Sequence, residues 1–124
     1  MTAKDKGSER RKHARRDVLE TFHVFLVIPK VGPQKIYLRD LSEGGMALVA
    51  EAEDPLKLQD VVSCFLHINP NLKLPLSFKV THVKVDADGT KRLGCEFDDT
   101  SSKAYKAYVK FLDLLDELSA FLDQ

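Results

Sequence analysis

The residues best suited to chemistry lie in two short segments of the first half of the sequence. Arg11 and Arg15 are four residues apart in a basic segment, and Asp40, Ser42 and Gly45 follow in a predicted turn. A guanidinium can donate paired hydrogen bonds to a phosphate or a guanine edge, and it can stack on a purine face. Carboxylate and hydroxyl groups add an acceptor and a donor, and glycine permits close backbone approach. The two segments therefore favour binding of an anionic ligand over catalysis.

The charge of the chain is unevenly distributed. Residues 1–16 contain seven basic and two acidic residues, a formal charge of +5, although the net charge of all 124 residues is zero. Like charges concentrated in a short polar segment repel one another until an anion neutralises them. We therefore expect a basic arm that meets an anion, with a solvated, disordered terminus as the alternative.

Signatures of catalysis and of metal binding are missing from the sequence. The histidines and the two cysteines, Cys64 and Cys95, do not have the spacing of a zinc site, and no nucleophile or phosphate-loop motif occurs. We expect no enzymatic activity, no metal and no cofactor. Both cysteines lie in apolar runs, and the chain lacks an apolar stretch of about 18 residues. These features predict buried free thiols in a cytoplasmic protein that does not insert into a membrane.

Short apolar runs separated by turn signals predict an all-β domain. We expect strands over 21–28 and 34–41, paired as a hairpin, and further strands over 46–49, 61–68, 78–85 and 92–97. The apolar positions change phase near His82, which predicts a bulge or a change of facing there. The strand spacing favours an antiparallel barrel or sandwich over an alternating α/β fold.

From about Ser102 the apolar period becomes helical, with Thr100 and Ser101 as candidate N-caps. One side of this helix carries Phe111, Leu112, Leu115, Leu118 and Leu122, and the other carries Lys106, Lys110, Asp113, Asp116 and Glu117. The apolar residues cover roughly 200° of the circumference, about twice the arc that one core-facing side needs. We therefore expect one side to pack on the barrel and another on a second copy, giving a homodimer, or on a partner protein. The alternative is a helix that buries its whole apolar arc within the monomer.

In this context the motifs Arg11-x-x-x-Arg15 and Asp40-x-Ser42-x-x-Gly45 resemble those of the PilZ family, and the segment 93–97 is similar to the family's last barrel strand. The resemblance covers about residues 9–100. It implies a six-stranded antiparallel β-barrel with a C-terminal helix. The domain would divide into a flexible basic arm (1–16), the barrel (17–100) and the amphipathic helix (101–124).

The resemblance also implies a bacterial receptor that binds the second messenger cyclic di-GMP and passes the signal to a downstream protein. It assigns ligand binding to Arg11, Arg15, Asp40, Ser42 and Gly45, with Arg10, Arg16, Gly44 and Gly94 as secondary candidates. Asp40 would accept from a guanine edge, and Ser42 would donate to a phosphate or a base. One alternative is a PilZ-like adaptor that works by protein contact, with weak or no nucleotide binding. A nucleic-acid binder fits less well, because Tyr37 is the only tyrosine in a predicted strand and the chain has no tryptophan.

Overall fold

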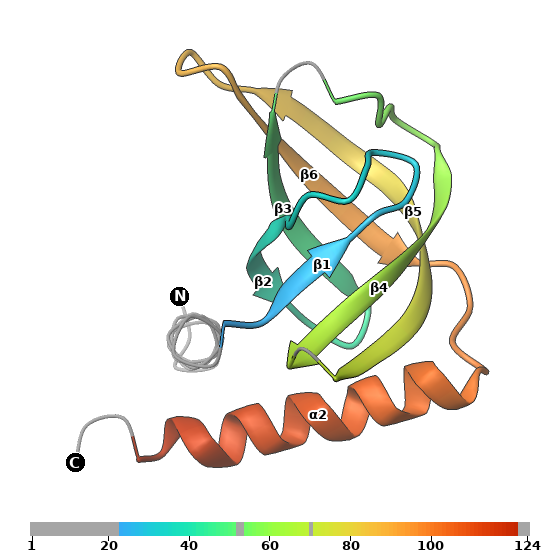
Figure 1. Ribbon diagram of the computed structural model, residues 1–124, viewed down its shortest axis with the longest axis vertical. Coiled ribbons are helices and arrows are strands. Elements are labelled where there is room, and N and C mark those ends of the chain that lie inside the picture. The colour runs from blue at the N-terminus through green and yellow to red at the C-terminus, as the bar shows by residue number, and fades with distance from the viewer. Residues whose placement is uncertain (1–22, 52–53, 70, 122–124) are drawn as a thin grey trace, which may run out of the picture.

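The computed structural model describes residues 23–51, 54–69 and 71–121. They form one antiparallel sheet in the order β1-β4-β5-β6-β3-β2, followed by one helix. The strands are β1 (Phe25–Val27), β2 (Tyr37–Leu41), β3 (Gly45–Glu51), β4 (Val61–Asn69), β5 (Leu72–Val85) and β6 (Thr90–Phe97), and the helix is α2 (Lys103–Ser119). Figure 1 shows the sheet curling into a barrel.

The two outer strands of the sheet meet at one pair of residues. Leu26 and Ile36 exchange two backbone hydrogen bonds of 2.9 and 2.8 Å, so the sheet is a nearly closed barrel, as predicted. The predicted hairpin of the first two strands is confirmed only at this bridge, because β1 forms its ladder with β4, from Phe25 opposite His67 onward. After β1 the chain turns at Ile28, whose carbonyl accepts from the amides of Val31 and Gly32. This wide turn separates the two strands, and only the Leu26–Ile36 bridge joins them.

Alternating residues of each strand fill the barrel interior. Leu48, Leu66 and Phe78 are fully buried there, as the period-2 pattern of the strands requires. Cys64 and Cys95 are also buried and free, which confirms the prediction for both thiols. Burial raises the pKa of each to about 12, so both stay protonated and behave as small apolar side chains.

A bulge interrupts the pairing of β5 with β6. The register shifts between Val80 and His82, so Thr81 is the extra residue and His82 lies opposite Gly94. This confirms the irregularity predicted near His82. The extra residue changes which side chains of β5 face which side of the sheet, and it places Thr81 and His82 beside the middle of β6.

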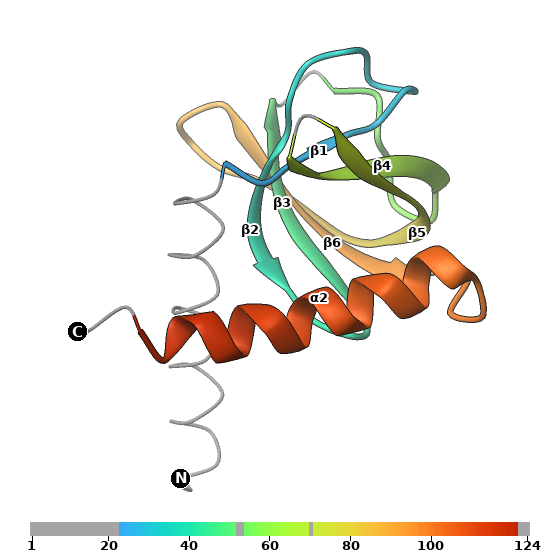
Figure 2. The ribbon, with the colours of Figure 1, turned by 60° about the horizontal axis from the view of Figure 1, so that its bottom comes forward.

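The helix α2 lies across one end of the barrel (Figures 1 and 2). Its N-cap is Ser102, whose Oγ accepts from the amide of Tyr105 at 3.0 Å. The predicted caps were wrong, and Ser101 is unsuited to the role because its hydroxyl and amide both donate to Asp99. The helix buries Tyr108, Leu112 and Leu115. Its predicted charged strip, Lys106, Lys110 and Asp113, is exposed.

Among the described residues no helix is both long and apolar enough to cross a bilayer.

Candidate ligand-binding site

The turn that joins β2 to β3 is braced by its own polar groups. The amide of Ser42 donates to the carbonyl of Gly45 at 2.9 Å, and the amide of Gly45 donates to Ser42 Oγ at 3.3 Å. Asp40 Oδ1 accepts from the amide of Leu41 at 2.8 Å. Asp40 and Ser42 therefore both stabilise the turn, in addition to any contact they make with a ligand.

Neighbouring elements satisfy the other carbonyls of this turn. The hydroxyls of Tyr108 and Tyr105 donate to the carbonyls of Ser42 and Glu43, at 2.8 and 2.5 Å. The amide of Phe97 donates to the carbonyl of Gly44 at 2.9 Å. By contrast, the amides of Glu43 and Gly44 have no acceptor within the described part of the chain. The turn therefore has two backbone amides available to donate hydrogen bonds to a ligand, which suits an anion.

Three glycines near the turn have different structural roles. A Cβ at Gly45 would lie 1.8 Å from the carbonyl oxygen of Cys95, so this glycine lets β3 approach β6. A Cβ at Gly44 would meet nothing within 4 Å. A Cβ at Gly94 would lie 3.1 Å from the Cβ of His82, so Gly94 leaves space for the His82 side chain across β6.

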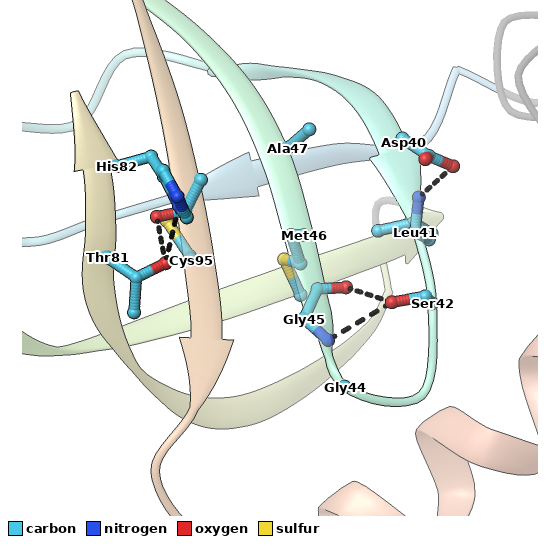
Figure 3. A pocket seen from close by; sticks show the side chains of 11 residues that line it. Asp40, Leu41, Ser42, Gly44, Gly45, Met46, Ala47, Thr81, His82 and Cys95 are labelled. Carbon is cyan, nitrogen blue, oxygen red and sulfur yellow. Dashed lines mark hydrogen bonds between the residues drawn. The ribbon is translucent and has the colours of Figure 1, made fainter. Parts of the chain in front are cut away.

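A hollow of about 450 Å³ lies beside the turn. Its lining residues are Asp40, Leu41, Ser42, Gly44, Gly45, Met46, Ala47, Thr81, His82, Gly94 and Cys95. Figure 3 shows the turn on one side of the hollow and Thr81 with His82 on the other. Thr81 Oγ1 donates to the carbonyl of Gly94 at 3.2 Å and lies 3.2 Å from His82 Nδ1, which fixes both side chains.

A second hollow of about 440 Å³ adjoins the first and shares Ala47, His82 and Gly94 with it. Three cationic side chains line it: Arg39 of β2, Lys84 of β5 and Arg92 of β6. The guanidinium of Arg92 pairs with Asp86, with Nε 2.9 Å from Oδ2. These cations border a surface that is continuous with the turn, and they raise the potential there for an anion.

The structure brings together every predicted site residue that it describes. Asp40, Ser42, Gly44, Gly45 and Gly94 all line the first hollow. The four predicted arginines, Arg10, Arg11, Arg15 and Arg16, lie outside the described residues. No metal-binding group of His, Cys, Asp or Glu occurs in the described ranges.

Sequence reasoning missed five residues of this surface: Arg39, Thr81, His82, Lys84 and Arg92. The change of phase in the apolar pattern near His82 could have drawn attention to Thr81 and His82. The position of His82 opposite Gly94, however, depends on the strand register, which the sequence does not give. Lys84 and Arg92 lie opposite each other in the same ladder, which the sequence does not reveal either.

Comparisons with known proteins agree with this architecture. The chain resembles the inhibitor of motility MotI/DgrA of Bacillus subtilis (TM-score 0.56, 10% identity, 73% of this chain and 44% of that one). It also resembles MrkH in the K. pneumonia MrkH–c-di-GMP complex (TM-score 0.61, 20% identity, 78% and 48%). A third similar structure is the PilZ domain of YcgR from Escherichia coli with c-di-GMP (TM-score 0.55, 16% identity, 68% and 73%). At these identities the likeness shows the fold alone.

The chain spans less than half the length of the first two of these proteins, 44% and 48%. A search of curated proteins found no match to the sequence. The family model described as the PilZ domain matches residues 9–114, which include both motifs, the barrel and most of α2. This chain therefore belongs to the PilZ domain family.

Proposed function

We propose that this protein is a receptor for cyclic di-GMP, and that the ligand lies on the surface formed by the β2–β3 turn and the two adjoining hollows. The main support is the turn itself, in which the carbonyls from Ser42 to Gly45 are satisfied while the amides of Glu43 and Gly44 have no acceptor among described residues. Two of the similar structures contain c-di-GMP, and the family match covers both motifs.

Each group on this surface has a chemistry that suits the ligand. The amide of Gly44 and the hydroxyl of Ser42 suit a phosphate, and the carboxylate of Asp40 can accept from the N1 and N2 groups of a guanine. Arg39, Lys84 and Arg92 add positive charge along the second hollow. We assign the remaining contacts to Arg11 and Arg15, whose planar guanidinium groups can clamp a phosphate or a guanine edge.

The receptor has no catalytic role in this proposal. Ligand binding orders the basic arm against the barrel and changes the surface that a downstream protein meets. The protein acts in the bacterial cytoplasm, where this messenger is found. A PilZ-like adaptor with weak or no nucleotide binding is the alternative, and a titration separates the two.

The direct test is calorimetric titration with cyclic di-GMP, cyclic di-AMP and GTP at one fixed salt concentration. We expect selective binding of cyclic di-GMP. Arg15→Ala should weaken it by about tenfold or more, because a charge-assisted paired contact is lost. Lys6→Ala is the control, because it also removes one positive charge from the basic segment but lies outside the motif. It changes only the general electrostatic potential, so affinity should stay within about threefold of the wild type. Ser42→Ala and Asp40→Ala should also weaken binding.

The same titration identifies the failures. A wild type that does not bind cyclic di-GMP would support the adaptor function instead. Unchanged affinity in both Arg11→Ala and Arg15→Ala would reject the arm as a binding element. If Asp40→Ala lowers stability but leaves affinity intact, Asp40 only braces the turn.

A further inference from the structure

The helix α2 holds the candidate ligand turn through two tyrosine hydroxyls. Tyr108 donates to the carbonyl of Ser42 at 2.8 Å, and Tyr105 donates to the carbonyl of Glu43 at 2.5 Å. Both rings contact the ring of Phe97 edge to face, with centroids 4.8 and 5.3 Å away, and Tyr108 is fully buried. Packing thus fixes the tyrosine rings, and the hydroxyls have defined positions below the turn.

These two hydrogen bonds also orient the two amides that have no acceptor among the described residues. The carbonyl of Ser42 and the amide of Glu43 belong to one peptide group, and the carbonyl of Glu43 and the amide of Gly44 belong to the next. The structure contains no cis peptide bond among the described residues, so the C=O and N–H of each group point in opposite directions. A tyrosine that holds the carbonyl toward α2 therefore holds the amide of the same peptide away from α2.

Tyr105 keeps its donor at neutral pH. Burial, and secondarily the nearby Glu43, raises the pKa of Tyr105, so its hydroxyl stays protonated. The carbonyl of Gly44 is bound by the backbone of Phe97, so α2 specifically determines the orientation of the other two peptides.

We propose that Tyr105 and Tyr108 are positioning residues for ligand binding, because they hold two adjacent peptide groups with their amides turned outward as an anion site. The inference rests on the proposed function and extends it to α2. An anion bound to the amides polarises the two peptide groups and strengthens the bonds from their carbonyls to the tyrosines. Binding and the seating of α2 are therefore coupled, and each stabilises the other. The helix α2 is therefore the element whose packing on the barrel changes in stability when the ligand binds.

Removal of single hydroxyls tests the proposal. Tyr105→Phe and Tyr108→Phe keep the rings on Phe97, and we expect each to weaken cyclic di-GMP binding by about three- to tenfold, the effect of one lost hydrogen bond. Tyr37→Phe is the matched control, since Tyr37 is exposed on β2 and lines neither hollow, and it should bind as the wild type does. Tyr108→Phe leaves a carbonyl without its donor and can lower stability, so the half-buried Tyr105 provides the decisive variant.

A second measurement separates positioning from mere structural support. Amide hydrogen exchange over residues 106–119 should slow on saturation with cyclic di-GMP in the wild type, and much less in the Tyr105→Phe, Tyr108→Phe double variant. Wild-type affinity in both single variants, with normal binding by the parent protein, would overturn this inference and leave the receptor function standing. A parent protein that does not bind would overturn both.

Discussion

Gly44 and Gly45 are adjacent residues in opposite environments. A Cβ at Gly45 would meet the backbone of β6 at 1.8 Å, whereas one at Gly44 would meet nothing within 4 Å. We expect Gly45→Ala to cost about 3 kcal/mol or more of unfolding free energy, because β3 and β6 must separate. Gly44→Ala should change the unfolding free energy by less than about 0.5 kcal/mol or stabilise slightly. Urea unfolding followed by circular dichroism compares the pair, and equal losses would contradict the steric argument.

At the scale of elements, β6 contributes an unusual interior residue. Lys91 is buried, and its Nζ donates to the carbonyls of Asp54 and Leu56, at 2.6 and 3.0 Å. The ammonium group thus anchors the connection between β3 and β4 to the end of the barrel. A buried carbonyl that loses its donor is costly, and a methionine would fill the space without replacing the hydrogen bonds.

We therefore expect Lys91→Met to lower the unfolding free energy by about 1–3 kcal/mol. Lys79→Met is the control, because Lys79 is exposed on β5 and should tolerate the same change. Denaturant unfolding of both variants gives the comparison. Similar stabilities for the two variants would show that Lys91 does not anchor the connection.

The strands and the helix could be predicted because their patterns are local. Alternation of apolar residues follows from the geometry of a strand with one buried face, and the phase change near His82 marked a real bulge. The pairing of β1 with β4 could not be predicted in this way, because nothing in the local pattern of Phe25–Val27 specifies a partner about 40 residues away. The N-cap was misplaced because Ser101 and Ser102 are equivalent in sequence, and only the contact with Asp99 distinguishes them.

The turn of the candidate site could be predicted from its motif, but the residues of other elements that surround the turn could not. Asp40, Ser42 and the glycines form one turn, so their proximity follows from the sequence. The tyrosines that hold this turn lie 62 and 66 residues away along the chain, and their aromatic character alone indicated only a packed helix face. Contacts across such separations depend on how the helix meets the barrel, which no local pattern encodes.

At the scale of the whole molecule, apolar side chains of α2 and of the turn after it are uncovered. Leu114 of α2 is 47% exposed, and Phe121, two residues beyond the end of the helix, is 68% exposed, whereas Tyr108, Leu112 and Leu115 of α2 are buried. The predicted second packing surface, which stays a prediction, would include these two residues. We expect the protein to self-associate through them, as an apolar helix face favours.

Sedimentation over a range of protein concentrations tests this expectation. Leu114→Glu should abolish self-association without unfolding the domain, because Leu114 is not part of the buried core. Lys110→Glu introduces the same side chain on the charged strip and should associate as the wild type does. A wild type that is monomeric at every concentration, with and without ligand, would rule out the homodimer.

The barrel is closed most weakly between its two outer strands, where the Leu26–Ile36 bridge is the one pairing among the described residues; we call this junction the seam. Two backbone hydrogen bonds close it, whereas β4 and β5 pair along almost the whole of β4. Local opening is easier where fewer interactions must break, so this seam should part far more often than the rest of the barrel unfolds. The three-residue strand β1 begins at Phe25, nine positions after Arg16, the last of the four arginines. The ladders therefore determine how long the whole barrel stays folded, and the seam is the place where we expect the barrel to open first.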